Sequence, residues 1–202
     1  MKRFLMIAIA SIAVSSLVAS YAIAFPETQQ IDPMEQAKAW AQIDTAPSAL
    51  SGDVAMQGDT ITVYADEVNR ITARYAASGV DDGEQRAIDY ILRREALCNA
   101  GIAAGFTASE EEVQDIIDTE MEWESGADGQ EYFQAYLDEA GLTAEEYWDT
   151  QRNVIYKEII IGKYLDSERE KTGITDADEW DAHEKELVQT LIQNDHVTSV
   201  AD

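Results

Sequence analysis

The stretch "GLTAEEYW", residues 141–148, decides how this chain is divided into helices. Glycine adopts the left-handed backbone conformation that ends a helix, and the apolar residue after it folds back onto the last turn. The hydroxyl of Thr143 accepts a hydrogen bond from a free backbone N–H of the following helix, and Glu146 reaches back to complete a capping box. The stretch therefore predicts that one helix ends at Gly141 and that the next begins directly after it.

The same pattern occurs twice more, as "GFTASEEE" from Gly105 and "GITDADEW" from Gly173. In the first of these copies, Ser109 with Glu112 is as good a cap as Thr107, so two helix starts stay open. The spacings of 36 and 32 residues resemble those of a helical repeat array, but the residues between the copies do not match. We therefore interpret all three copies as joints between helices, rather than as a repeat or a ligand-binding motif.

Apolar residues recur at helical spacing on either side of these joints. The pattern predicts six helices, over residues 66–78, 82–105, 110–124, 130–141, 144–173 and 176–194. The chain is therefore expected to be mostly α, as a multi-helix domain.

Two short segments have a strand pattern instead. The stretch "DTITVYADE", residues 59–67, alternates apolar and polar side chains, and "HVTSV", residues 196–200, is rich in β-branched residues. A single strand cannot satisfy its own backbone groups. We therefore expect Thr60–Tyr64 to pair with His196–Val200 in a small two-stranded sheet that joins the two ends of one domain, residues 59–202.

The first residues have the composition of a targeting segment. Lys2 and Arg3 precede an apolar run over residues 4–25, and residues 22–24 form an A-x-A cleavage site. This pattern favours a secretory signal peptide over residues 1–24. The alternative is an uncleaved membrane anchor, because the apolar run is just long enough to span a bilayer. Either interpretation places the rest of the chain outside the cytoplasmic membrane, secreted or anchored to its outer face.

Residues 25–58 contain all three prolines of the chain and many small polar residues. Within them, only "MEQAKAWAQI" from Met34 has a short helical pattern, with Trp40 on its apolar side. This composition predicts a flexible tether between the targeting segment and the helical domain.

The chain is strongly acidic. Its 202 residues include 40 Asp and Glu against 14 Lys and Arg, for a net charge of −26. Such a surface repels nucleic acid and anionic lipid headgroups, because binding to them requires Lys and Arg. The charge is explained by solubility outside the cell, and the sharper alternative is a preference for basic or unfolded polypeptides.

No residue pattern indicates an enzyme, a cofactor site or a metal site. Cys98 is the only cysteine and lies in a helical pattern, as a small buried residue would. His183 and His196 are the only histidines, and neither has a zinc-ligand or catalytic spacing. The acidic runs lack the alternating ligands of an EF-hand, and no phosphate loop, dinucleotide fingerprint or serine elbow occurs.

Aromatic residues gather on both sides of the joint at Gly141. Most are expected in the core. Tyr and Trp also tolerate partial exposure to solvent, so some of these residues are candidates to line a groove for apolar polypeptide segments. The candidate polypeptide-binding residues are Trp123, Tyr132, Phe133, Tyr136, Tyr147 and Trp148.

The order of these parts resembles the N-terminal domain of the SurA/PrsA-type extracytoplasmic chaperones. The most specific likenesses are "GFTASEEEV" at Gly105–Val113 and "YLDEAGLTAEEYW" at Tyr136–Trp148, and the resemblance covers residues 60–166. It implies a helical chaperone domain that holds unfolded polypeptides. Full members carry a parvulin-type prolyl isomerase domain before the closing helix, whereas only residues 166–178 lie there in this chain. Isomerase activity is therefore not expected.

Two functions follow as expectations. The first is a non-catalytic, chaperone-like module outside the cytoplasmic membrane that binds unfolded or extended polypeptides. The alternative is a structural or adaptor protein that docks one specific partner in the cell envelope. Neither function requires a cofactor, and the sequence does not determine the oligomeric state.

Overall fold

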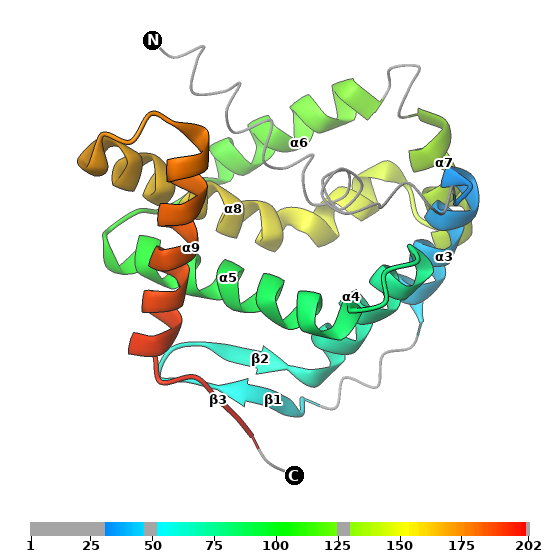
Figure 1. Ribbon diagram of the computed structural model, residues 1–202. Coiled ribbons are helices and arrows are strands. Elements are labelled where there is room, and N and C mark those ends of the chain that lie inside the picture. The colour runs from blue at the N-terminus through cyan, green and yellow to red at the C-terminus, as the bar shows by residue number, and fades with distance from the viewer. Residues whose placement is uncertain (1–30, 47–51, 125–129, 201–202) are drawn as a thin grey trace.

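The computed structural model describes residues 31–46, 52–124 and 130–200. Seven helices and three short strands occur in this part of the chain (Figure 1). In chain order they are α3 (Pro33–Thr45), β1 (Val54–Gln57), β2 (Thr62–Tyr64), α4 (Ala65–Ala77), α5 (Gly83–Ala103), α6 (Glu110–Glu124), α7 (Gln130–Ala140), α8 (Ala144–Thr172), α9 (Ala177–Asn194) and β3 (Thr198–Ser199). The six predicted helices are thus confirmed, with bounds that differ by at most two residues.

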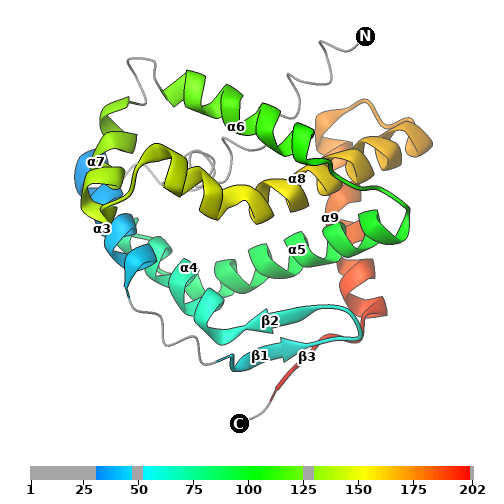
Figure 2. The same ribbon diagram turned by 180° about the vertical axis from the view of Figure 1, so that it is seen from behind.

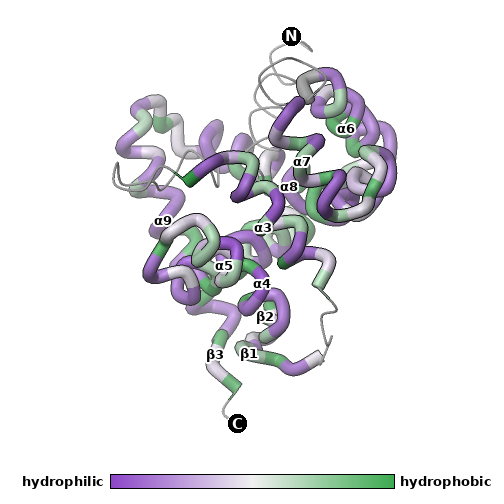
Figure 3. The backbone as a smooth tube through the Cα atoms, turned by 90° about the vertical axis from the view of Figure 1, so that its right-hand side faces the viewer, coloured by the Kyte–Doolittle hydropathy of each residue, from purple (hydrophilic) through white to green (hydrophobic). Residues whose placement is uncertain are grey.

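Helices α5 and α8 run side by side through the middle of the molecule (Figure 1). The sheet lies next to α4 and α5, on the side away from α8, and α6 packs along α8 (Figure 2). Helix α3 packs against α7 and α4 at one end, while α9 crosses α5 at the other. Hydrophilic and hydrophobic residues alternate along the helices (Figure 3), as expected where each helix has one face turned to the core.

The sheet is three-stranded and antiparallel, in the order β2-β1-β3. Met56 of β1 lies opposite Val63 on one side and Ser199 on the other. The predicted direct pairing of Thr60–Tyr64 with His196–Val200 is therefore wrong, because β1 lies between these two strands. The residues of β1, "VAMQ", lack the alternation that marks β2, so the sequence did not distinguish this strand from a tether.

The two ends of the domain do meet, through a side chain as well as through the sheet. Asp195, directly after α9, accepts hydrogen bonds from the backbone N–H groups of Thr60 (2.8 Å) and Ile61 (2.9 Å). A Cβ atom added to Gly58 would lie 2.0 Å from Asp195 Oδ2, so the β1–β2 turn needs glycine to approach this carboxylate. The end of α9 is therefore fastened to the turn between β1 and β2.

The joint at Gly141 has the predicted geometry. Gly141 has a φ of +68°, and the N–H of Leu142 donates to the carbonyl of Leu137 at 3.1 Å. Thr143 Oγ1 accepts from the N–H of Glu146 at 3.2 Å, and the Glu146 carboxylate accepts from the N–H of Thr143 at 2.8 Å. Both halves of the capping box are present.

The other two joints differ from this one in the residue that caps the helix. Ser109, rather than Thr107, forms the capping box with Glu112 at the start of α6. At the start of α9, Asp176 accepts from two backbone N–H groups, so the expected cap by Thr175 is wrong by one residue. A carboxylate is the stronger acceptor at the positive end of a helix.

The predicted tether over residues 25–58 is wrong for two segments, since α3 and β1 both pack into the fold. Helix α3 begins at an Asp32 cap followed by a proline, and it buries Ala37, Trp40 and Ala41. The short helical pattern from Met34 is confirmed as part of α3, but its signal in the sequence was weak because Trp40 is the one large apolar side chain on the buried face. The domain therefore begins earlier than residue 59, while residues 25–30 and 47–51 lie outside the described ranges.

Candidate functional site

The predicted aromatic residues are mostly part of the core. Phe133, Tyr136, Tyr147 and Trp148 are all less than a tenth exposed and belong to one apolar cluster between α3, α6, α7 and α8. Their rings pack edge to face, with centroids 5.2 Å apart for Phe133 and Tyr147 and 5.4 Å apart for Tyr136 and Tyr147. The joint at Gly141 turns the chain so that α7 and α8 bring these rings together.

The other two predicted aromatic residues, Tyr132 and Trp123, are not among these four. Tyr132 is half-buried and packs edge to face against Trp40 of α3, whereas the side chain of Trp123 lies outside the described part of the structure. The expectation that most of the set is core is thus confirmed for four of its residues. As packed here, those four offer little surface to a polypeptide, and a role for them in binding stays a prediction.

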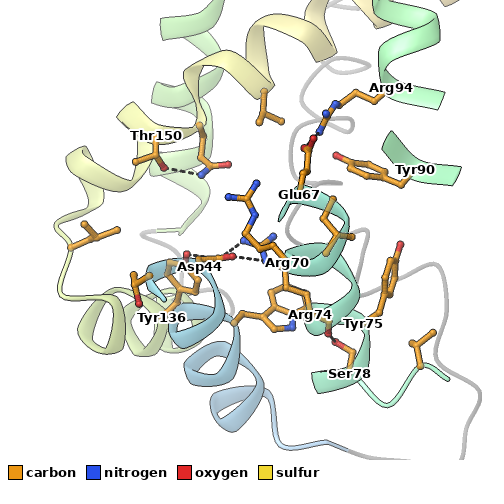
Figure 4. A pocket seen from close by; sticks show the side chains of 17 residues that line it. Asp44, Glu67, Arg70, Arg74, Tyr75, Ser78, Tyr90, Arg94, Tyr136 and Thr150 are labelled. Carbon is orange, nitrogen blue, oxygen red and sulfur yellow. Dashed lines mark hydrogen bonds and ion pairs between the residues drawn. The ribbon is translucent and has the colours of Figure 1, made fainter. Parts of the chain in front are cut away.

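A pocket of about 410 Å³ opens beside this cluster, between α3, α4, α5, α7 and α8 (Figure 4). Its apolar wall includes Trp40, Ile71, Tyr75, Leu142 and Val154, and its polar lining includes three arginines and two carboxylates. The arginines are Arg70 and Arg74 of α4 and Arg94 of α5, and the carboxylates are Asp44 of α3 and Glu67 of α4. Basic groups thus outnumber acidic groups in this pocket, although the whole chain carries a charge of −26.

At the floor of the pocket, Asp44 is hydrogen-bonded to two neighbouring side chains. This carboxylate forms an ion pair with Arg74, whose Nε donates to Oδ1 at 2.8 Å, and it also accepts the Tyr136 hydroxyl at 2.7 Å. The guanidinium of Arg74 lies over the ring of Trp40, 5.6 Å from its centroid. Burial alone would lower the pKa of Arg74, but its attraction to Asp44 and their hydrogen bond raise it, so this arginine stays charged. Burial first, and then Asp44, raises the pKa of Tyr136, so its hydroxyl stays a donor.

A second set of charges forms the wall on the α5 side. Arg94 binds Glu67 through Nη1 at 2.9 Å and Glu95 through Nε at 2.8 Å. Lys157 of α8 binds the same Glu95 at 2.7 Å. Desolvation opposes the charge of Arg94, but the two carboxylates outweigh it and raise its pKa. A smaller and more polar cavity of about 300 Å³ continues behind Arg94 and Glu67, toward β2.

Arg70 differs from both of these arginines. Its side chain extends from α4 into the open centre of the pocket, and no interaction is drawn to its guanidinium (Figure 4). Among the described residues it has no hydrogen-bond or ion-pair partner. The residue is exposed, so a ligand can reach it. The pocket thus presents one unneutralised cation beside an apolar wall.

An apolar wall beside a few charged groups is typical of a ligand-binding pocket. The hydroxyl of Tyr136 donates to Asp44, but this carboxylate is also paired with Arg74, and neither described histidine lines the pocket. His183 lies beside Trp180 on α9, and His196 lies 2.9 Å from Asp59 near the sheet. Across residues 31–46, 52–124 and 130–200, no group of three or more His, Cys, Asp or Glu is placed to hold a metal ion.

Sequence reasoning missed this pocket because its parts come from five helices. Two of its key residues, Trp40 and Asp44, lie in α3, in the segment predicted to be a tether. One signal was available: "RITAR", residues 70–74, places two arginines four positions apart, and hence on one face of a predicted helix, in a chain with few basic residues.

The chain gives no significant match to any protein-family model, curated protein or solved structure. Within the described ranges, no helix is both long and apolar enough to cross a membrane. The predicted targeting segment, residues 1–24, and the alternative anchor, residues 4–25, lie outside those ranges.

Proposed function

We propose that this chain is a non-catalytic module that binds extended polypeptide, and that it does so in the pocket between α3, α4, α5, α7 and α8. The observation that supports this proposal is the amphipathic lining: an apolar wall of Ile71, Leu142 and Val154 faces fixed ion pairs and the free guanidinium of Arg70. A polypeptide carries apolar and polar groups within a few ångströms of each other, and such a lining accepts both. The volume of about 410 Å³ lies in the range of small binding sites.

The location and the class of function are also part of the proposal. The positive, apolar and small-residue sequence of residues 1–24 favours action outside the cytoplasmic membrane. The resemblance of the joints at Gly105 and Gly141 to the SurA/PrsA-type chaperones favours polypeptide as the ligand. We expect no prolyl isomerase activity, and acceleration of a proline-limited refolding reaction by homogeneous protein would contradict this part of the proposal.

The alternative function, an adaptor for one envelope partner, is favoured by a specific observation. Ion pairs between Arg74 and Asp44 and between Arg94 and Glu67 hold the walls of the pocket in place. Among the described residues, the large exposed apolar side chains lie on β2 (Tyr64), α5 (Ile102) and α6 (Met121) and directly after β3 (Val200). A small pocket with charges held in ion pairs suits one kind of segment better than a wide range of unfolded chains.

A matched pair of variants tests whether the pocket is the binding site. Gln151→Trp places a large ring in the pocket, whereas Gln189→Trp places the same ring on an exposed position of α9. With a labelled unfolded model polypeptide, fluorescence anisotropy should show binding to the wild-type protein and to Gln189→Trp, and much weaker binding to Gln151→Trp. Failure of the wild-type protein to bind any unfolded or extended polypeptide would overturn the proposal.

Photo-cross-linking separates the two forms of the function. A photoreactive amino acid at position 151, in the pocket, should capture many unrelated chains in intact cells if the protein is a general chaperone. One dominant product would instead support the adaptor. The same group at position 189 serves as the control for nonspecific capture.

A further inference from the structure

Arg70 is unusual among the basic residues of this chain. The chain has 14 Lys and Arg, and twelve of them, all but Lys2 and Arg3, lie in the described ranges. Nine of those twelve form ion pairs, and Arg169 donates to a backbone carbonyl. Only Arg70 and Lys185 have no hydrogen-bond or ion-pair partner among the described residues, although the chain contains 40 acidic side chains.

The acidic groups nearest to Arg70 in the pocket are already engaged. Glu67, one helical turn before it, is bound by Arg94, and Asp44 is bound by both Arg74 and Tyr136. Arg74 lies one turn after Arg70 on the same face of α4, and two like charges at this spacing repel each other. Arg70 is therefore held beside another cation in a pocket whose own carboxylates have other partners.

We propose that Arg70 binds a carboxylate of the polypeptide that enters this pocket, and that an apolar side chain next to that carboxylate lies against Ile71, Leu142 and Val154. This inference rests on the proposed function and adds to it the chemical class of the segment. A guanidinium matches a carboxylate in a planar, two-point contact, and the bound charge also relieves the repulsion between Arg70 and Arg74.

The charges of the chain favour a carboxylate over a polyanion. Asp44, Glu67 and Glu95 balance the charges of Arg74, Arg94 and Lys157, which leaves Arg70 as one unpaired positive charge. One guanidinium balances one carboxylate. A phosphate dianion or a nucleic acid strand would bring more negative charge to a protein whose net charge is already −26.

Three labelled peptides test the inference on the full-length protein. The first holds Glu between leucines and has blocked termini, the second has Gln in place of Glu, and the third is the Gln peptide with a free C-terminal carboxylate. The Glu peptide should bind roughly 10- to 100-fold more tightly than the blocked Gln peptide, as expected for a charge-assisted hydrogen bond. Equally tight binding of the third peptide would identify a chain terminus as a second source of the same group.

Variants at two unpaired basic residues make the test specific. Arg70→Gln should remove the preference for Glu over Gln, and Arg70→Lys should keep part of it, because a lysine retains the charge but not the planar fork. Lys185→Gln removes the same charge from an exposed position of α9 and should leave the preference unchanged. Melting curves of the Arg70 variants check that the fold is intact.

Some outcomes would contradict the role of Arg70 while leaving the proposed binding of polypeptide in the pocket unaffected. If the peptides bind and Gln151→Trp weakens them, but Arg70→Gln does not change the preference for Glu, then the pocket binds polypeptide without reading a carboxylate. Displacement of the Glu peptide by inorganic phosphate, but not by acetate at the same ionic strength, would show that the site prefers a dianion. If no peptide and no unfolded polypeptide binds, the proposed function itself fails.

Discussion

Thr143 and Ser109 each begin a helix with the same pair of hydrogen bonds, to Glu146 and Glu112 respectively. Within the described ranges, the hydroxyl of Thr107 has no hydrogen-bond partner. Loss of such a cap leaves a backbone N–H without its partner. We expect Thr143→Ala and Ser109→Ala each to lower the free energy of unfolding by about 1 kcal/mol. Thr107→Ala is the matched control and should change little. Urea unfolding measures all three, and an equal loss in the control would contradict the assignment of the caps.

Glu120 on α6 is a single residue with a pH-dependent effect on stability. Its side chain is 3% exposed, and its Oε1 has no hydrogen-bond partner in the described part of the chain. Desolvation raises the pKa of this carboxyl from 4.5 to about 7. Between these two values the folded protein holds a proton that the unfolded chain has lost. The free energy of unfolding therefore falls as the pH rises through this window.

Glu120→Gln removes this ionisation. We expect the variant to be more stable than the wild-type protein at pH 8, by roughly 1–3 kcal/mol, and to lose this advantage toward pH 4.5. Urea unfolding at a series of pH values measures the difference. Glu186→Gln, at an exposed position of α9, is the control for the loss of one negative charge. A constant difference between pH 5 and pH 8 for Glu120→Gln would contradict the assignment.

At the scale of elements, β3 and the end of α9 attach to the sheet in two distinct ways. β3 adds a short ladder to β1, including the hydrogen bond from the N–H of Val200 to the carbonyl of Ala55 at 3.0 Å. Asp195, before β3, holds the β1–β2 turn through Thr60 and Ile61. The carboxylate contacts are charge-assisted and are therefore stronger than the neutral ladder.

Two truncations separate these contributions. Removal of residues 197–202 deletes β3 but keeps Asp195, and should lower the free energy of unfolding by about 1–2 kcal/mol. Removal of residues 195–202 also deletes the carboxylate, and should cost roughly 2 kcal/mol more. Thermal and urea unfolding of both proteins measures the difference. Equal losses would show that Asp195 does not fasten the turn.

At the scale of the whole molecule, the excess of acidic groups opposes the folded state. A net charge of −26 is held in a compact volume after folding, and the mutual repulsion of these charges is weaker in the expanded chain. Salt screens this repulsion. We expect the melting temperature to rise by about 2–5 °C between about 10 mM and about 150 mM NaCl.

Calorimetry at several concentrations of NaCl measures this effect. KCl at the same ionic strength is the control and should give the same shift, because screening does not depend on which monovalent salt is used. CaCl₂ at matched ionic strength tests for a specific cation site. A melting temperature that falls with added NaCl would show that favourable ion pairs, such as those around Arg74 and Arg94, outweigh the repulsion.

The sequence by itself determined the features that depend on neighbouring residues. Helices α4 to α9 follow from apolar spacing and from the glycine joints, since a helix is closed by hydrogen bonds within a few residues and its ends by caps of the same range. The capping box at Thr143 was predicted on this basis and is confirmed.

Only the tertiary structure decided the features that depend on distant residues. β1 becomes a strand because β2 and β3 pair with its two edges. Helix α3 has only a weak apolar pattern of its own, and its packing against α7 stabilises it. The pocket likewise joins Asp44 to Arg74 and Glu67 to Arg94 across separations of 30 and 27 residues. Residue types and spacing do not show which partners such charges find. Among the described residues, Arg70 is the one arginine without a hydrogen-bond or ion-pair partner, and this became visible only when the other pairs had been placed.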